Sequence, residues 1–481
     1  MKMLEKCFKL KSNGTTVRTE LMAGLTTFMT MAYIIALNPN LLTNFGAEGA
    51  ELWNGVFMAT CIASAVGMFC MAFIANKPFA LAPGMGLNSF FAVVVGNIVT
   101  MTGMTYVESF QSALIIILAE GIVFIVLSLF NVREKIVESI PLGIRLGISP
   151  AIGLMLMNIG LGSNVSIYAA GNNFETPFFV MRDFFGALTP GVLQTAMGAE
   201  GYATMILSAI TMFVGLFVII AMDKKGVKGA VLVGMLVASV VYWAGSFLFL
   251  NTNPFASLAT ASFLPPVKDM VDTTLFKFNF AGFMEIGWFT VITLVITFCI
   301  IDMFDTIGTL VGTASRAGMV DENGNMPNMK EALLSDAIGT VVGACTGTST
   351  VTTFVESASG VEAGGRTGLT ALATGVLFLA CIFIAPIAAI IPAAATSSAL
   401  IYVGVLMLQG LSKVDFKDMD QMVPVFLMLL AMPVSGSIGH GIGLGLIAYT
   451  IIKIFSGKFK DVSILTYVIS ALFIVKFFLV V

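Results

Sequence analysis

Two aspartates inside a long apolar stretch are the residues of this sequence that could do chemistry at an unusual depth. Asp302 and Asp305 interrupt residues 284–312, MEIGWFTVITLVITFCIIDMFDTIGTLVG, a stretch long enough to cross a bilayer as a helix. Three residues apart on a helix, the two side chains project from one face. Because a carboxylate in hydrocarbon costs about 2.5–3.5 kcal/mol even on insertion scales, the pair indicates a polar substrate or a proton. The alternative is a structural pair satisfied by neighbouring hydroxyls and backbone.

Two more polar residues, Asn88 and Glu356, follow stretches that are poor helix formers. The first stretch reads KPFALAPGMGLNSFF, and the second reads GTSTVTTFVESASGVEAGG. Extended backbone at membrane depth is tolerated only where it is buried in protein or lines a cavity. Interrupted segments in corresponding places of two halves indicate the binding site of a transporter.

An amide and carboxylates together suit a flat heterocycle that carries ring N–H groups. Asparagine offers a donor and an acceptor, whereas a carboxylate accepts N–H donors or carries a proton. The candidates for stacking on such a ring are four phenylalanines, Phe90, Phe91, Phe304 and Phe354. For Asn88 an interhelical hydrogen bond remains the alternative. Glu120 is interpreted as a structural hydrogen-bond partner, since its apolar run has no break.

Composition places the chain among polytopic membrane proteins. Of its 481 residues, 58% are hydrophobic and 11% are charged, against about 25% charged in soluble proteins. The net charge of −3 excludes a broad nucleic-acid-binding surface. With a single histidine and neither a CxxC pair nor a GxxxxGK[ST] loop, we expect no metal, no cofactor and no ATP-driven pump. The sequence contains no pattern that resembles a paired nucleophile and base, so we do not expect an enzyme.

Apolar runs divide the chain into two sets of seven. They lie at 21–38, 55–75, 79–99, 111–131, 136–162, 203–222 and 229–250, and at 284–312, 333–346, 349–362, 367–391, 393–411, 422–436 and 438–456. Residues 463–480 either span the bilayer or lie along its surface. With the N-terminus in the cytoplasm, inside loops hold 20 Lys and Arg and outside loops hold 3. This asymmetry satisfies the positive-inside rule.

The two sets resemble each other. The fifth run reads IPLGIRLGISPAIGLMLMNIGL from Ile140, and the twelfth reads IPAAATSSALIYVGVLMLQGL from Ile391. Because each set has an odd number of runs, the second copy starts from the opposite side of the membrane. This pattern is typical of the inverted repeats of secondary transporters.

Long motifs resemble the purine permeases of the nucleobase–cation symporter-2 family, in the AzgA-like branch that carries hypoxanthine, guanine and adenine. They read GTTVRTELMAGLTTFMTMAYIIALNPN, ALAPGMGLNSFFA, DMFDTIGTLVG, GTSTVTTFVESASGVEAGGRTGLTA and IPAAATSSALI. The resemblance covers about residues 13–456. It implies an all-α, uracil-permease-like fold of about fourteen helices in a 7+7 inverted repeat, with short antiparallel strands at the start of spans 3 and 10.

The resemblance also implies a division into domains. A cytoplasmic lead, 1–20, precedes a first repeat, 21–250, with core spans in 21–131 and gate spans in 136–250. A second repeat, 284–456, has core spans in 284–391 and gate spans in 393–456, and 457–481 form a C-terminal apolar segment. We expect a multi-pass plasma-membrane protein, and the resemblance suggests a homodimer.

Carried over by motif, the substrate-binding residues are Asn88, Asp302, Asp305 and Glu356, with the backbone N–H groups of Phe354 and Val355 beside the base. The uracil and xanthine branches usually show a Glu and a nearby His in span 8, where this chain has DMFDTIGT. We expect proton symport by alternating access, with the proton on Asp302, Asp305 or Glu356. The alternatives are a same-fold transporter of xanthine, uracil or a small anion, and an uncoupled facilitator.

Overall fold

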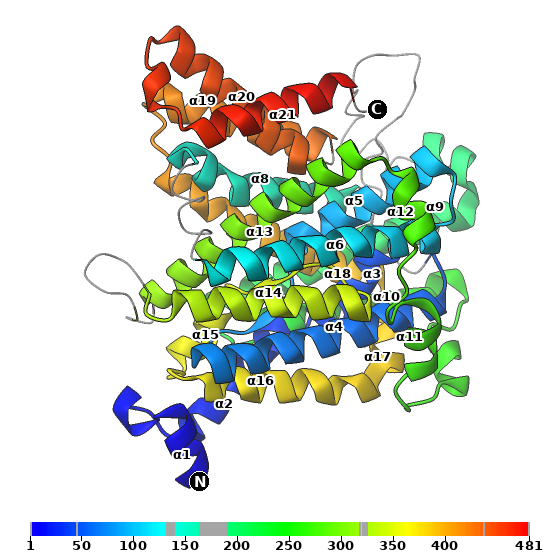
Figure 1. Cartoon of the computed structure of the whole chain (residues 1–481). Coiled ribbons are helices and arrows are strands. Elements are labelled where there is room, and N and C mark those ends of the chain that lie inside the picture. The colour runs from blue at the N-terminus through cyan, green and yellow to red at the C-terminus, as the bar shows by residue number, and fades with distance from the viewer. Residues whose placement is uncertain are drawn as a thin grey trace.

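The computed structural model describes residues 2–44, 47–130, 140–162, 190–316, 319, 326–435 and 438–479 (Figure 1). Eleven helical segments of these residues are long and apolar enough to cross a membrane. The prediction of an all-α polytopic membrane protein is therefore confirmed. Three of the fourteen predicted runs are not among the eleven: 333–346 lies in a helix that carries Asp336, 349–362 is partly extended, and 422–436 lies in a 17-residue helix.

The helices of the first half are α1 (Lys2–Phe8), α2 (Val17–Met31), α3 (Ile34–Leu42), α4 (Ala50–Cys70), α5 (Met85–Thr102), α6 (Tyr106–Leu129), α8 (Leu142–Leu161), α9 (Pro190–Lys224) and α10 (Ala230–Gly245). Those of the second half are α11 (Val267–Thr273), α12 (Phe280–Glu285), α13 (Trp288–Arg316), α14 (Met329–Thr346), α15 (Ser357–Glu362), α16 (Gly368–Ala380), α17 (Ala385–Ala389), α18 (Ala393–Met407), α19 (Met419–Ser435), α20 (Ile438–Phe455) and α21 (Ile464–Leu479).

Two predicted runs are broken by turns. The first, 21–38, is divided between α2 and α3 by a turn at Ala32 and Tyr33. The eighth, 284–312, was expected to be one helix and is not, because its first residues belong to α12. Gly287, with φ of 84°, separates α12 from α13, and this left-handed conformation is one that glycine adopts without strain.

Two short strands form the sheet of the described structure. β1 (Leu81–Pro83) and β2 (Val351–Thr353) pair antiparallel, with Ala82 opposite Thr352. Their ends are held by further backbone hydrogen bonds, from Gly84 N–H to the Thr350 carbonyl and from Phe354 N–H to the Ala80 carbonyl, both at 3.0 Å. The prediction of antiparallel strands at the start of spans 3 and 10 is confirmed. Pairing satisfies backbone groups that hydrocarbon could not.

The helices pack in two groups that each draw on both halves of the chain. The first group contains α2, α4, α6, α14 and α16, and α4, α6, α14 and α16 run side by side in Figure 1. The second contains α8, α9, α10, α18, α19 and α20. The strands, α5, α13 and α15 also belong to the first group. The strands contact α4 and α14, helices α5 and α13 contact α6, and α15 contacts α2.

Helices α8 and α18, which open on the two similar Ile-Pro sequences, pack closely against each other. Gly153 and Gly404 occupy the same position after Ile140 and Ile391. A Cβ on Gly153 would lie 2.5 Å from the Gly404 carbonyl oxygen, and a Cβ on Gly404 would lie 2.5 Å from that of Gly153. Equivalent helices therefore cross at equivalent glycines, as small residues allow in membranes.

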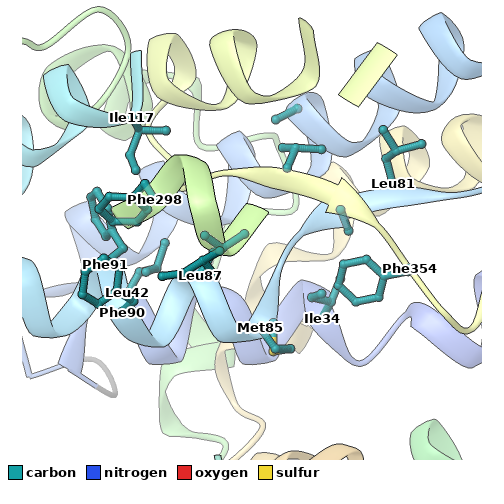
Figure 2. Close-up of a cluster of buried hydrophobic side chains, with 14 of the residues drawn as sticks. Ile34, Leu42, Leu81, Met85, Leu87, Phe90, Phe91, Ile117, Phe298 and Phe354 are labelled. Carbon is teal, nitrogen blue, oxygen red and sulfur yellow. The ribbon is translucent and has the colours of Figure 1, made fainter. Parts of the chain in front are cut away.

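A cluster of apolar side chains surrounds the strands (Figure 2). Phe90 and Phe298 lie 4.6 Å apart between ring centroids, and Phe91 and Phe110 lie 5.2 Å apart. Phe90 and Phe91 are both buried, so their rings pack against the protein core. Phe354 also belongs to this cluster and is labelled in Figure 2.

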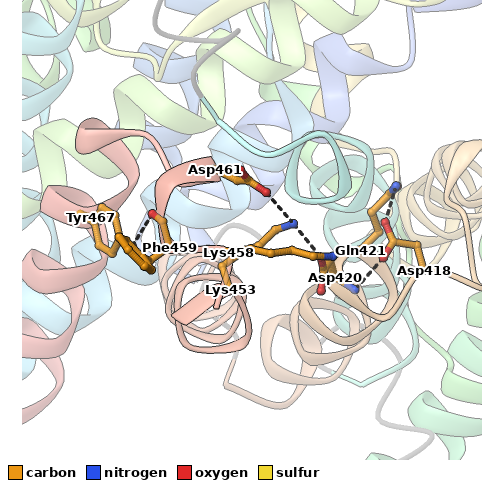
Figure 3. Close-up of polar contacts among 8 residues, drawn as sticks. All are labelled: Asp418, Asp420, Gln421, Lys453, Lys458, Phe459, Asp461 and Tyr467. Carbon is orange, nitrogen blue, oxygen red and sulfur yellow. Dashed lines mark hydrogen bonds and ion pairs between the residues drawn. The ribbon is translucent and has the colours of Figure 1, made fainter. Parts of the chain in front are cut away.

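Charged side chains gather where α19, α20 and the segment before α21 meet (Figure 3). Lys453 Nζ lies 2.6 Å from Asp420 Oδ2 and 4.0 Å from Asp461 Oδ2, and Lys458 Nζ lies 3.7 Å from Asp420 Oδ2. The side chains of Lys453 and Asp420 are only 12% and 15% exposed. These ion pairs join α19 to α20 and to the turn that leads into α21.

Candidate functional site

A cavity of about 560 Å³ lies between the strand region and the second group of helices. Its lining from the first group includes Thr30, Tyr33, Gly84, Met85, Gly86, Asp305, Thr309 and residues 352–356. Its lining from the second group includes Ser149, Asp223, residues 226–231, Tyr402 and Gly410. The volume is within the range of small-molecule sites in proteins.

Glu356 brings a carboxylate to this cavity from the turn between β2 and α15. Its side chain is half-buried. The hydroxyl of Tyr33 donates a hydrogen bond of 2.7 Å to Glu356 Oε1. Tyr33 is fully buried and lies at the turn between α2 and α3 that breaks span 1. The unbroken apolar pattern of 21–38 carries no sign of that break, so the sequence did not predict a role for Tyr33.

Asp305 brings a second carboxylate to the cavity from α13. It is half-buried, and the Thr352 hydroxyl donates to its Oδ2 at 3.5 Å. Within the residues that the structure describes, no Lys or Arg forms an ion pair with Asp305 or Glu356. Their hydrogen bonds from protein side chains come from the neutral hydroxyls of Thr352 and Tyr33. An ionised group removed from water needs strong partners, so these acids are suited to bind N–H donors or a proton.

Asp302 lies behind the cavity and is fully buried. The Thr306 hydroxyl donates to Asp302 Oδ1 at 2.9 Å and also lies 3.2 Å and 3.1 Å from Oδ1 and Oδ2 of Asp336. Asp336 is on α14 and is also fully buried. A hydroxyl has one hydrogen, so Thr306 donates to only one of these acids at a time. The sequence analysis missed Asp336, although an aspartate within the run 333–346 is the same signal that identified Asp302.

Asn88 is fully buried and is held by protein groups instead of facing the cavity. Its amide donates to Asn38 Oδ1 at 2.6 Å and to the Pro83 carbonyl at 3.2 Å, and the Ser349 hydroxyl donates to its Oδ1. Asn38 in turn donates to Thr60 at 2.7 Å and to Thr348 at 2.9 Å. These contacts correspond to the interhelical alternative and join the two broken segments.

The backbone N–H groups of Phe354 and Val355, between β2 and Glu356, are expected beside the base. The structure agrees with only part of this expectation. The Phe354 N–H donates to Ala80, so it is already used by the strand pair and is not free for a ligand. Val355 lines the cavity with a side chain that is 50% exposed. The Phe304 side chain lies outside the described part of the chain. Glu120 accepts a hydrogen bond of 2.7 Å from Thr350, which links α6 to the residue before β2.

Comparison with known proteins decides the family. Residues 18–438 match the Permease family, which covers most of the chain. The chain belongs to this family. It is thus a member of a transporter family, and the resemblance to nucleobase–cation symporter-2 permeases is confirmed.

Full-length relatives support the assignment. The permease is 38% identical to the adenine permease AdeP of Escherichia coli (strain K12) over 474 residues, which cover 98% of this chain and 96% of the relative. It is 37% identical to the guanine/hypoxanthine permease PbuO of Bacillus subtilis (strain 168) over 476 residues, which cover 98% of this chain and all of the relative.

Solved structures with the same fold come from other transporters. The transmembrane domain of the cyanobacterium bicarbonate transporter BicA matches with a TM-score of 0.61 and 16% identity, over 88% of this chain and 97% of that domain. The murine Solute Carrier 26 family member A9 anion transporter, in its inward-facing state, matches with a TM-score of 0.56 and 12% identity, over 91% of this chain and 68% of that one. At these identities the likeness concerns the fold.

Proposed function

We propose that the permease imports the purine nucleobases hypoxanthine, guanine and adenine by proton symport. The observation that carries this proposal is the pair of carboxylates, Asp305 and Glu356, in a cavity where their protein partners are neutral hydroxyls. The printed substrates of the full-length relatives, adenine for AdeP and guanine or hypoxanthine for PbuO, are flat bases with N–H donors. A carboxylate is a natural acceptor for such donors.

Transport follows an alternating-access cycle in a 7+7 inverted repeat. We assign the first group of helices, with the strands, to the core (21–131 and 284–391) and the second group to the gate (136–250 and 393–456). The α8–α18 contact at equivalent glycines supports this symmetry. The cavity lies between core and gate, so movement of one against the other opens it to alternate sides. The permease is expected in the plasma membrane, with a cytoplasmic N-terminus and as a homodimer.

In this proposal the acids have separate roles. Glu356 accepts hydrogen bonds from the ring N–H groups of the purine, next to Val355. Asp305, across the cavity, and the Asp302–Thr306–Asp336 cluster behind it hold the coupling proton. Asn88 supports the site from behind by joining the broken segments. No cofactor is required beyond the proton.

A small-anion substrate, as in the solved transporters of this fold, is less compatible with the cavity. Asp305 and Glu356 would repel an anion, since like charges at close range are unfavourable. Lys228 is a cation in the lining, but its Nζ lies 3.4 Å from Glu362 Oε2, another lining residue.

Uptake of radiolabelled hypoxanthine into cells that lack their own purine permeases tests the function. Protonophore-sensitive uptake that excess guanine or adenine blocks, and uracil does not, supports the proposal. Uptake of a pyrimidine or an anion in place of hypoxanthine would contradict it. In liposomes the label must accumulate as unmodified base.

A further inference from the structure

We propose that Tyr33 is a positioning residue for purine binding: it holds one oxygen of Glu356 so that the other oxygen is available to the base. This inference rests on the proposed function. It assigns a role to the first span, for which the acid and amide pattern predicted none.

The geometry that supports this role is a contact between the two halves of the chain. Tyr33 lies at the turn that separates α2 from α3, and Glu356 lies between β2 and α15. The phenol donates to Oε1 at 2.7 Å, a short distance typical of a hydrogen bond to an ionised acceptor. Both residues line the cavity, and the tyrosine is fully buried.

The consequence for a ligand follows from the number of carboxylate oxygens. A carboxylate has two oxygens, and a phenol on one of them fixes the rotation of the group while the second oxygen is left for another donor. Glu356 precedes a short helix and has no lysine or arginine to orient it in the described part of the chain. A side chain locked by a supporting hydrogen bond presents its acceptor in one geometry, which lowers the cost of binding.

A second tyrosine in the cavity does not duplicate this contact. Tyr402 lines the cavity from α18, in the second group of helices. The hydrogen bond to Glu356 comes from Tyr33.

The test compares Tyr33→Phe with a matched control in the full-length permease. Tyr106 also buries most of its side chain and donates to a protein oxygen, the Leu42 carbonyl at 2.9 Å, but it does not line the cavity. Tyr33→Phe and Tyr106→Phe each remove one phenolic hydrogen bond from the core. Hypoxanthine uptake gives KM and Vmax at equal surface abundance, and melting of the purified proteins reports stability.

We expect Tyr33→Phe to raise KM about ten- to a hundredfold, the effect of losing a hydrogen bond to a charged group, with Vmax within about twofold. Tyr106→Phe should leave KM within about twofold. Glu356→Asp withdraws the carboxylate by one methylene and breaks the same bond from the other side. Combined with Tyr33→Phe, it should raise KM to about the level of the stronger single variant, because coupled residues are not additive.

Three results would overturn the inference. They are an unchanged KM in Tyr33→Phe, a fall in Vmax and melting temperature without a rise in KM, and independent, multiplying effects of the two substitutions. Each of these presupposes a wild-type protein that transports purine. Failure of the wild type to take up any purine would instead overturn the proposed function.

Discussion

Two carboxylates of this permease, Asp420 and Glu356, have opposite surroundings. Asp420, in the first turn of α19, has Lys453 at 2.6 Å and Lys458 at 3.7 Å (Figure 3). Glu356, in the cavity, has the neutral hydroxyl of Tyr33 at 2.7 Å and no Lys or Arg partner within the described residues. The first acid is neutralised by the protein, whereas the second is left to be neutralised by something that comes and goes.

This difference separates a structural carboxylate from a functional one. A permanent cation beside an acid in a low-dielectric site stabilises the charged form and occupies its oxygens. An acid with hydroxyl partners only can bind N–H donors or take up a proton. Substitutions at Asp420 and at Glu356 should therefore affect different properties, protein stability at the first and purine transport at the second.

The largest effect is expected for Glu356→Gln. An amide retains the size but loses one acceptor oxygen and the negative charge, so hypoxanthine uptake should fall by about two orders of magnitude or more, as for charged hydrogen bonds made to a ligand. Uptake at equal surface abundance checks the prediction. Asp420→Asn is the control and should retain uptake within about twofold. Similar losses in both variants would remove the distinction between the two acids.

Asp305→Asn should remove the coupling of uptake to protons while leaving the binding of hypoxanthine intact. An amide cannot carry the proton, so uptake should lose its dependence on external pH, and accumulation should fall at least about tenfold while hypoxanthine still binds. Initial rates across a pH series, together with equilibrium binding, measure both. The same pH profile in wild type, Asp305→Asn and Asp302→Asn would contradict proton coupling through these acids.

The buried cluster should respond as one unit. Because Thr306 contacts both Asp302 and Asp336, Asp302→Asn and Asp336→Asn should reduce uptake by similar factors, and the double variant by less than their product. We expect single losses of about three- to thirtyfold, the cost of altering a buried polar network. Kinetics of the three variants provide the test. Full activity in Asp336→Asn would show that this acid is only a packing partner.

At Asp420, the carboxylate paired with lysines, the expected loss is in the stability of the folded protein. Lys453→Met leaves Asp420 with Lys458 as its remaining cation, and we expect unfolding to become easier by about 1–2 kcal/mol, between the values of exposed and buried pairs. Melting of the purified protein in detergent measures this change. KM for hypoxanthine should stay unchanged, and a raised KM would mean that the charged end of α19–α21 influences the cavity.

The smallest effect is expected for Lys228→Met. Its pair with Glu362 is about half exposed on both sides, and such pairs contribute about 0–1 kcal/mol. Uptake should change by less than about fivefold, and less in high salt, because salt screens exposed charges. A loss of uptake as large as that of Glu356→Gln would show that this pair belongs to the binding site and that Lys228 acts there as a cation.

Sequence reasoning predicted the parts of this site that disturb an apolar pattern. Charges in apolar runs identified Asp305 and Glu356. The Pro- and Gly-rich stretch before Asn88 indicated an interrupted helix, whereas the antiparallel strand β1 was implied by the family resemblance. The direction in which a side chain points could not be predicted, because α5 is apolar on nearly every face. For Asn88 the sequence therefore left both ligand contact and an interhelical hydrogen bond open, and in the structure its amide lies among Asn38, Pro83 and Ser349. The contact of Tyr33 with Glu356 joins residues 323 positions apart, and no local pattern of the sequence indicates such a pair.

Accumulation of radiolabelled hypoxanthine by proteoliposomes under an imposed pH gradient tests the central claim most directly. With the outside acidic, the wild-type permease should concentrate the base above its equilibrium level, and Glu356→Gln should not. Asp420→Asn should accumulate it like the wild type. Equal uptake with and without the gradient would contradict proton symport, and accumulation by Glu356→Gln at the wild-type level would contradict the site.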